Sequence, residues 1–122
     1  MRWLIHGNVT PAAIEAMRRH EQKPLPATDA QIAPDASIEE VVRGATKAQI
    51  EILTTDSSLV DAIFESGVPF GRTLVYLQLD GGDVEQDDAI DRLFARYKRL
   101  SPGRMYTVTG SRVKIRQLPG KQ

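Results

Sequence analysis

The chain has 122 residues, of which 41% are hydrophobic and 26% are charged, and its formal net charge at pH 7 is zero. Cysteine is absent, which excludes disulfide bonds and thiolate metal sites, and no apolar stretch approaches the roughly 18 residues of a membrane-spanning helix. We therefore expect a single domain over residues 1–122, with residues 118–122 as a loose tail, in a cytoplasmic protein that does not bind a membrane.

The first twenty residues are typical of a strand followed by a helix. Residues 2–6 form an apolar run that predicts a buried strand. Thr10 is a good N-cap and Pro11 suits the first turn of a helix, so a helix should extend from there to about residue 20. The apolar side chains expected to face the core from this helix are Ala13, Ile14 and Met17.

The next segment combines a proline-rich loop with a second helix and strand. Residues 22–36 contain three prolines and few bulky side chains, so we expect a loop with a short extended piece near Leu25. Ser37 and Glu40 have the spacing of a capping box, which predicts that a helix begins at Ser37. A second strand is expected over residues 49–54.

The remainder of the chain alternates helices and strands and ends in a hairpin. We expect a short helix that is capped by Asp56 or Ser57 and ends near Gly67. A strand over 73–79 and a helix over 86–99 should follow. The last two strands are expected over 105–108 and 112–118, joined by a turn at 109–111. This order predicts an α/β fold in which helices flank a mostly parallel central sheet, with a C-terminal β-hairpin at its edge.

Polar segments follow the first two expected strands. Residues 6–9 (His-Gly-Asn-Val) come directly after the first strand, and residues 54–57 (Thr-Thr-Asp-Ser) come directly after the second. Because ligands bind outside the carboxyl ends of parallel strands, we expect a functional site where these two segments meet.

The charges are distributed unevenly along the chain. Residues 80–91 contain six acids and no base, whereas residues 92–122 contain nine bases and no acid. Arg112, Lys114 and Arg116 alternate along the last expected strand, so they should share one face. This basic row can contact RNA or a protein partner, and it can equally protect an edge strand from unwanted pairing.

Four stretches carry a resemblance to a known family. They are Leu-Ile-His-Gly-Asn-Val at 4–9 with Pro11, Ile-Glu-Glu-Val at 38–41 with Ala45, Ile-Leu-Thr-Thr-Asp-Ser-Ser-Leu at 52–59, and Arg-Val-Lys-Ile-Arg-Gln-Leu-Pro at 112–119. In this order the chain resembles the short PIN-like proteins of the PilT N-terminus nuclease superfamily, which are often encoded in bacterial toxin–antitoxin settings. The resemblance spans nearly the whole chain and implies a three-layer PIN-like fold.

The resemblance also implies a metal site, and this chain lacks most of its acids. Members that cleave RNA hold Mg²⁺ or Mn²⁺ with three or four carboxylates at the strand ends, because such hard cations need several oxygen ligands. Four of the family's acidic positions are occupied here by His6, Gly7, Ile38 and Ser58. Only Asp56 and Asn8 remain, so we expect no metal site, no cofactor and a loss of catalysis.

Each remaining site residue also has a structural interpretation. Asp56 is the candidate catalytic residue, but Asp is equally suited to cap the following helix. We expect the strand-end cleft to be lined by a hydrogen-bonded histidine, a turn asparagine and two hydroxyl residues, which are His6, Asn8, Thr54 and Ser58. The acids near enough in the sequence to replace the lost ones are Asp35, Glu39 and Asp80.

Three functions remain open from the sequence. We favour a PIN-like domain that has lost metal-dependent ribonuclease activity and binds RNA or a protein as a non-catalytic module, in a toxin–antitoxin context. One alternative is a weak Mg²⁺- or Mn²⁺-dependent endoribonuclease that uses Asp56 with substitute acids. The other is a structural or regulatory subunit, such as a homo-oligomer assembled through the antiparallel edge.

Overall fold

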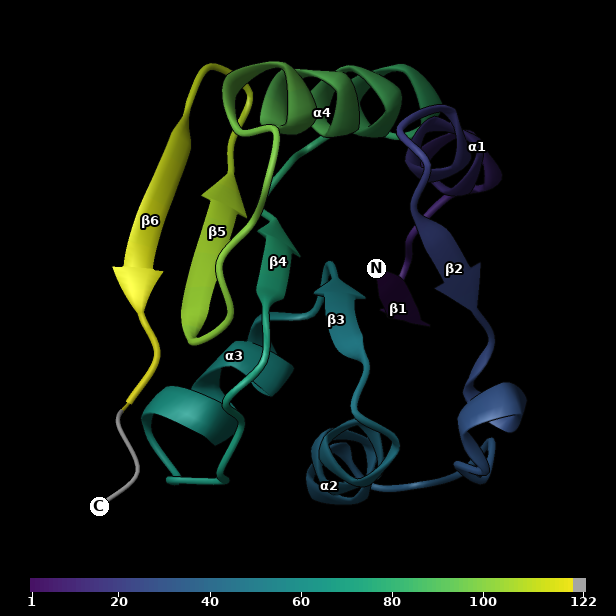
Figure 1. Cartoon of the computed structure of the whole chain (residues 1–122), viewed down its shortest axis with the longest axis vertical. Helices are drawn as coiled ribbons and strands as arrows, with labels where there is room; N and C mark the ends of the chain where they lie inside the picture. Colours follow the sequence, from purple (N-terminus) through teal and green to yellow (C-terminus); the bar gives the residue numbers. More distant parts are fainter. Residues whose placement is uncertain (120–122) are drawn as a thin grey trace.

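The computed structural model describes residues 1–119, which form six strands, four α-helices and one short 3-10 helix (Figure 1). The strands are β1 (Arg2–His6), β2 (Lys23–Leu25), β3 (Glu51–Thr54), β4 (Leu74–Leu77), β5 (Arg104–Val108) and β6 (Val113–Gln117). The helices are α1 (Pro11–Arg19), α2 (Ile38–Ala48), α3 (Ser57–Phe64) and α4 (Asp83–Arg96), and the 3-10 helix covers Ala27–Ala30. Within residues 1–119, none of the helices combines the length and the apolar character needed to cross a lipid bilayer.

One sheet contains all of these strands, in the order β2-β1-β3-β4-β5-β6. Neighbouring strands are parallel from β2 to β5, and β5 and β6 pair in the antiparallel direction. The structure thus confirms the expected α/β fold with a mostly parallel sheet and a C-terminal hairpin.

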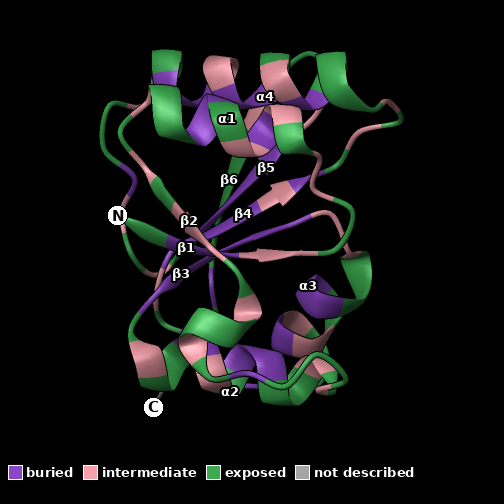
Figure 2. Ribbon diagram, turned by 90° about the vertical axis from the view of Figure 1, so that its right-hand side faces the viewer, coloured by how far each residue is buried: buried purple, intermediate pink, exposed green. Residues whose placement is uncertain are grey.

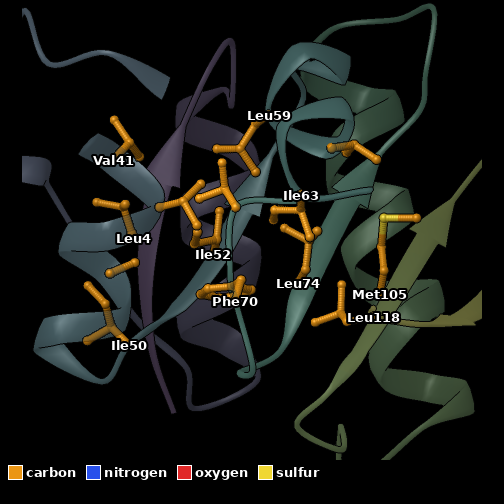
Figure 3. Packing of buried hydrophobic residues seen from close by; sticks show 14 of the residues in the cluster. Leu4, Val41, Ile50, Ile52, Leu59, Ile63, Phe70, Leu74, Met105 and Leu118 are labelled. Carbon is orange, nitrogen blue, oxygen red and sulfur yellow. The ribbon is translucent and has the colours of Figure 1, made fainter. Parts of the chain in front are cut away.

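The helices cover the sheet in two pairs and produce three layers (Figure 2). Helices α1 and α4 pack on one face, which we call the α1/α4 face, and α2 and α3 pack on the other, the α2/α3 face. Each face therefore has its own apolar core. On the α2/α3 face, Figure 3 shows side chains from four neighbouring strands packed against the two helices, among them Leu4, Ile52, Leu74, Met105, Val41, Leu59 and Ile63.

The position of α4 gives the sheet an uncommon topology. Helix α1 connects β1 to β2, toward one edge of the sheet, whereas α4 connects β4 to β5, toward the opposite edge, yet both lie on the α1/α4 face. The two crossovers therefore have opposite hands. About 98% of such crossovers in proteins are right-handed. Because these two crossovers differ in hand, one of them must be left-handed. Of the four α-helices, α2 and α3 are left to cover the α2/α3 face, where the 3-10 helix and the segment between α3 and β4 also pack.

Helix α4 is displaced from the range expected for it, residues 86–99, to Asp83–Arg96. Its acidic first turn explains the earlier start, because negative charges stabilise the positive end of a helix and the Glu85 carboxylate accepts the Gly82 N–H (3.0 Å). At the other end Tyr97 adopts an extended conformation and terminates the helix. The apolar stripe alone therefore placed both ends of the helix too late in the chain.

Two segments outside the main elements belong to the sheet and its core. The extended piece expected near Leu25 is confirmed as β2, which pairs with β1. Leu118, expected in a loose tail, is instead only 4% exposed, packs beside Met105 and donates its N–H to the Gly103 carbonyl (2.9 Å; Figure 3). The end of that expected tail, residues 120–122, lies outside the described residues.

Small side chains form most of the buried side of α1, which consists of Ala13, Ala16 and Met17. Ile14, expected in the core, is only half-buried and lines a surface hollow with Ile5. Helix α1 is fixed to α4 at its end, where His20 Nε2 shares a hydrogen bond with Asp91 Oδ1 (2.8 Å). The small residues allow α1 to approach the sheet and α4 closely.

An ion pair between a buried carboxylate and a half-buried guanidinium joins the beginning of β3 to the residues before β4. The Glu51 carboxylate is 2% exposed and accepts three hydrogen bonds: Oε2 from Arg72 Nε (3.1 Å) and Nη2 (2.8 Å), and Oε1 from the Thr73 N–H (2.8 Å). A buried carboxylate is costly unless it is paired and its oxygens are satisfied. Both conditions are met here, so the pair positions the residues that precede β4.

We predict that Arg72→Leu lowers the free energy of unfolding by about 3 kcal/mol, because it leaves the buried Glu51 charge without its partner. Arg43→Leu is the matched control, since it removes a guanidinium whose ion pair with Glu39 is exposed on both sides and contributes at most about 0.5 kcal/mol. Urea unfolding followed by circular dichroism measures both variants. Equal decreases in the free energy of unfolding for the two variants would contradict a stabilising role for the Glu51–Arg72 ion pair.

Candidate functional site at the carboxyl ends of β1 and β3

The order of the strands reverses beside β1, and this reversal defines the candidate site. From β1 the chain crosses to β2 on one side and then returns to β3 on the other side. In α/β sheets, ligands bind in the crevice outside the carboxyl ends of the strands at such a switch point. Here β1 ends at His6 and β3 ends at Thr54, and these two residues are partners in the parallel register. The strand-end residues singled out from the sequence therefore lie at the switch point.

The Thr54 hydroxyl connects the two strand ends. It belongs to a fully buried residue, shares a hydrogen bond with His6 Nδ1 (2.8 Å) and accepts the Asp56 N–H (2.9 Å). A second bond between the two loops runs from the Asn8 N–H to Thr55 Oγ1 (2.7 Å). Together these bonds hold the β1–α1 loop against the β3–α3 loop and bring four of the expected site residues together.

Asp56 caps helix α3. Its Oδ1 accepts the Ser58 N–H (2.8 Å), and its backbone has the extended conformation of an N-cap. This bond satisfies a backbone donor that has no partner inside the helix. Of the two caps expected from the sequence, Asp56 and Ser57, the structure contains the first. Ser58 is exposed in the first turn of α3.

Burial lowers the pKa of His6 from its ordinary value, because the protonated ring loses solvation in this half-buried position. The negative charge of Asp56 acts in the opposite direction and offsets part of this decrease in pKa. The ring is therefore neutral at neutral pH and has one nitrogen that donates a hydrogen bond and one that accepts. A neutral ring in the crevice is suited to hydrogen bonding rather than to ion pairing with a ligand.

Two residues that support the strand ends were not among the expected site residues. Gly7 has a φ of 81°, and a Cβ atom there would lie 2.6 Å from Thr55 Oγ1, so the turn requires glycine. Gln86 of α4 is 5% exposed; its Oε1 accepts the Thr10 N–H (2.9 Å) and its Nε2 donates to the Asn8 carbonyl (3.0 Å). A glycine directly after a strand was a usable signal for Gly7. The role of Gln86 depends on a contact across 78 residues and had no local signal.

A polar row crosses the sheet at the level of this site. Residues that are paired across neighbouring strands project to the same face of a sheet. Such pairs run across five strands here and place five side chains on the α2/α3 face, namely His6, Thr54, Tyr76, Thr107 and Lys114. We call this set the polar row. Neighbouring strands are about 4.8 Å apart, so the row spans roughly 19 Å. Its two threonines are buried, His6 and Tyr76 are half-buried, and Lys114 is exposed.

Basic side chains of the edge strand β6 project from the same α2/α3 face. Lys114 pairs with Thr107 and Arg116 pairs with Met105, so both cationic side chains project from the α2/α3 face, as the alternation predicted for them. The Arg116 guanidinium lies over the Phe64 ring of α3, with its carbon 3.9 Å from the ring centre. This contact fixes one cation beside α3 and leaves Lys114 at the end of the polar row.

The other bases of the carboxyl-terminal third lie elsewhere. Arg112 precedes β6 in the hairpin turn, where its backbone N–H donates to Thr109 Oγ1 (3.2 Å). Arg92 of α4 donates to the Thr109 carbonyl and so supports the same turn. Lys98 and Arg99 follow α4 and line a hollow beside Met1. The uneven distribution of charge along the chain therefore does not produce a single basic surface.

The acids considered as substitutes are dispersed. Glu39 is paired with Arg43 one turn further along α2, Asp35 lines a hollow with Glu40, and Asp80 is exposed in the β4–α4 loop. Nowhere in residues 1–119 do three histidine or acidic side chains gather closely enough to hold a metal ion. The donors beside Asp56 are an imidazole and hydroxyl groups, which do not fit the several oxygen ligands, mostly carboxylates, that Mg²⁺ or Mn²⁺ requires.

Comparison with known proteins found no match to this chain among protein-family models, curated proteins or solved structures. The chemistry of the site must therefore be argued from its geometry. The crevice presents hydrogen-bonding groups and one carboxylate at the β1 end of the polar row. The opposite end presents the cations of Lys114 and Arg116.

We predict that Gly7→Ala lowers the free energy of unfolding by about 1–2 kcal/mol, because alanine is strained at this φ and its Cβ collides with Thr55. Gly110→Ala is the control, since the added Cβ meets nothing within 4 Å and the backbone has no positive φ. Thermal and urea unfolding measure the difference. A loss in Gly7→Ala no larger than in the control would contradict the required turn.

We predict that Asp56→Asn lowers the pKa of His6 further, because it removes the charge that favours the protonated ring. Asparagine caps helices as well as aspartate does, so α3 should stay intact. The measurement is an NMR titration of the His6 ring, with the His20 ring as internal reference because it contacts Asp91 instead. An unchanged or higher pKa for His6 would show that the two side chains do not interact.

Proposed function

We propose that the chain is a PIN-like, non-catalytic module that binds single-stranded RNA along the polar row of the α2/α3 face. The observation that carries this proposal is the register of the sheet, which aligns the strand-end crevice with the basic edge strand.

The chemistry of the polar row supports RNA rather than an uncharged ligand. Lys114 and Arg116 supply positive charge for phosphates at one end. Tyr76, in the middle of the row, is half-buried and offers part of an aromatic ring, on which a base can stack. At the other end His6 and the exposed Asn8 offer hydrogen bonds to base edges.

The state of Asp56 supports the non-catalytic part of the proposal. One oxygen of this carboxylate caps α3, which is a structural role that the fold requires in any case. Its neighbours in the crevice are His6 and Thr54, which supply a nitrogen and a hydroxyl instead of further carboxylates. A metal-dependent cleavage mechanism would need more negative oxygen at this point.

We predict that the double variant Lys114→Gln/Arg116→Gln weakens binding of a fluorescein-labelled oligouridylate roughly tenfold at low salt, because two charge-assisted contacts are lost. The slope of log K against log[salt] should also become less negative, by about 1.4 for two phosphate contacts with a single strand. Fluorescence anisotropy at several salt concentrations measures both quantities. Lys98→Gln/Arg99→Gln removes the same charge at a distant place and should leave both unchanged.

Three results would contradict the proposal. Absence of binding at low salt, or equal losses in the two double variants, would exclude RNA recognition by the polar row. Cleavage of the oligouridylate in Mn²⁺ that Asp56→Asn abolishes would overturn the non-catalytic assignment and favour a ribonuclease.

A further inference from the structure

A second candidate site lies at the opposite end of the sheet, where the parallel strands begin. A cavity of about 580 Å³ opens between the end of α2, the segment between α3 and β4, and the residues that follow β6. Most of its wall is apolar, with contributions from Ile63, Val68, Pro69, Phe70 and Pro119. Its volume falls within the range of about 300–1,000 Å³ that is typical of small-molecule sites.

The polar residues of the wall are Thr46, Gln49 and Arg72, of which Arg72 is the charged one. Arg72 uses Nε and Nη2 to donate to Glu51 Oε2, and a guanidinium has five N–H donors. Three N–H donors of Arg72 therefore make no bond to Glu51. Within residues 1–119, no other side chain or carbonyl accepts a hydrogen bond from them. Since the Glu51 carboxylate also binds the Thr73 N–H, both of its oxygens are occupied and it holds Arg72 in place.

We propose that this cavity binds a small aromatic carboxylate. The aromatic body would occupy the apolar wall beside Phe70, and the carboxylate would accept the remaining N–H donors of Arg72. Planar carboxylates are the anions that a guanidinium recognises best, because two parallel hydrogen bonds can form. The site is separate from the polar row, so this inference does not depend on the RNA-binding proposal.

The test uses the full chain and 2-naphthoate as probe, followed by NMR of the backbone amides. We expect saturable shifts at Gly67, Val68 and residues 70–72 on addition of up to about 1 mM probe. 2-Naphthylmethylamine has the same aromatic body with a positive charge in place of the carboxylate, so it should bind at least about tenfold more weakly.

A filled cavity provides the matched variant. Gly71 lines the cavity, has no positive φ, and an added Cβ there meets nothing within 4 Å, so Gly71→Leu should fill the space without strain. Gly110→Leu is the control, because Gly110 has the same freedom in the distant hairpin turn. We expect Gly71→Leu to weaken 2-naphthoate binding at least about tenfold and Gly110→Leu to leave it unchanged, with both variants folded by their amide spectra.

Three outcomes would overturn this inference. They are the absence of saturable shifts for 2-naphthoate, equal binding of the amine and the carboxylate, and undiminished binding by a folded Gly71→Leu variant. Each outcome leaves the RNA experiment unaffected, since that experiment concerns the other end of the sheet.

Discussion

A parallel sheet must have both of its apolar faces covered, and the way this chain meets that requirement determines where its polar groups can lie. If α4 had followed α2 and α3 onto their face, α1 alone would have to cover the opposite side of β4 and β5, where Val75, Leu77 and Tyr106 are buried. Placing α4 beside α1 covers these residues at the cost of a crossover of opposite hand. On the α2/α3 face the carboxyl end of β5 and the residue paired with it on β6 consequently stay polar, as Thr107 and Lys114. Met105, near the beginning of β5, belongs to the apolar core of the same face.

The strand-end site depends on the same arrangement through one buried hydroxyl. Thr54 is enclosed because β1 and β4 flank β3 and α3 begins immediately after it. Most buried hydroxyls in proteins are hydrogen-bonded, and the partners of this one are His6 and the amide of Asp56. These two bonds keep the ends of β1 and β3 and the start of α3 in a fixed arrangement. Gln86 of α4 bonds to the Thr10 N–H and to the Asn8 carbonyl, so α4 also supports the loop that follows β1.

Local signals in the sequence predicted the elements well, because caps and turns depend on neighbouring residues. The Ser37–Glu40 capping box and the Asp56 cap were both identified before the structure and are present in it. The crevice was also predictable, since parallel strands bring their carboxyl ends together. The side of the sheet that α4 occupies was not predictable, and neither was the register that builds the polar row. Alternation within a strand shows which residues share a face, but pairing between strands depends on contacts across the whole chain.

The two ends of the sheet differ in the way they would recognise an anion. At the carboxyl ends the cations lie on an exposed edge strand, where water and salt weaken each contact, so several contacts are needed along an extended ligand. At the amino ends a single guanidinium is fixed by the buried Glu51 carboxylate before any ligand arrives. A ligand there would lose little free energy in ordering Arg72, and the apolar wall would supply the rest of the binding energy. Because Glu51 already neutralises that guanidinium, selectivity at this end must come from hydrogen-bond geometry rather than from net charge.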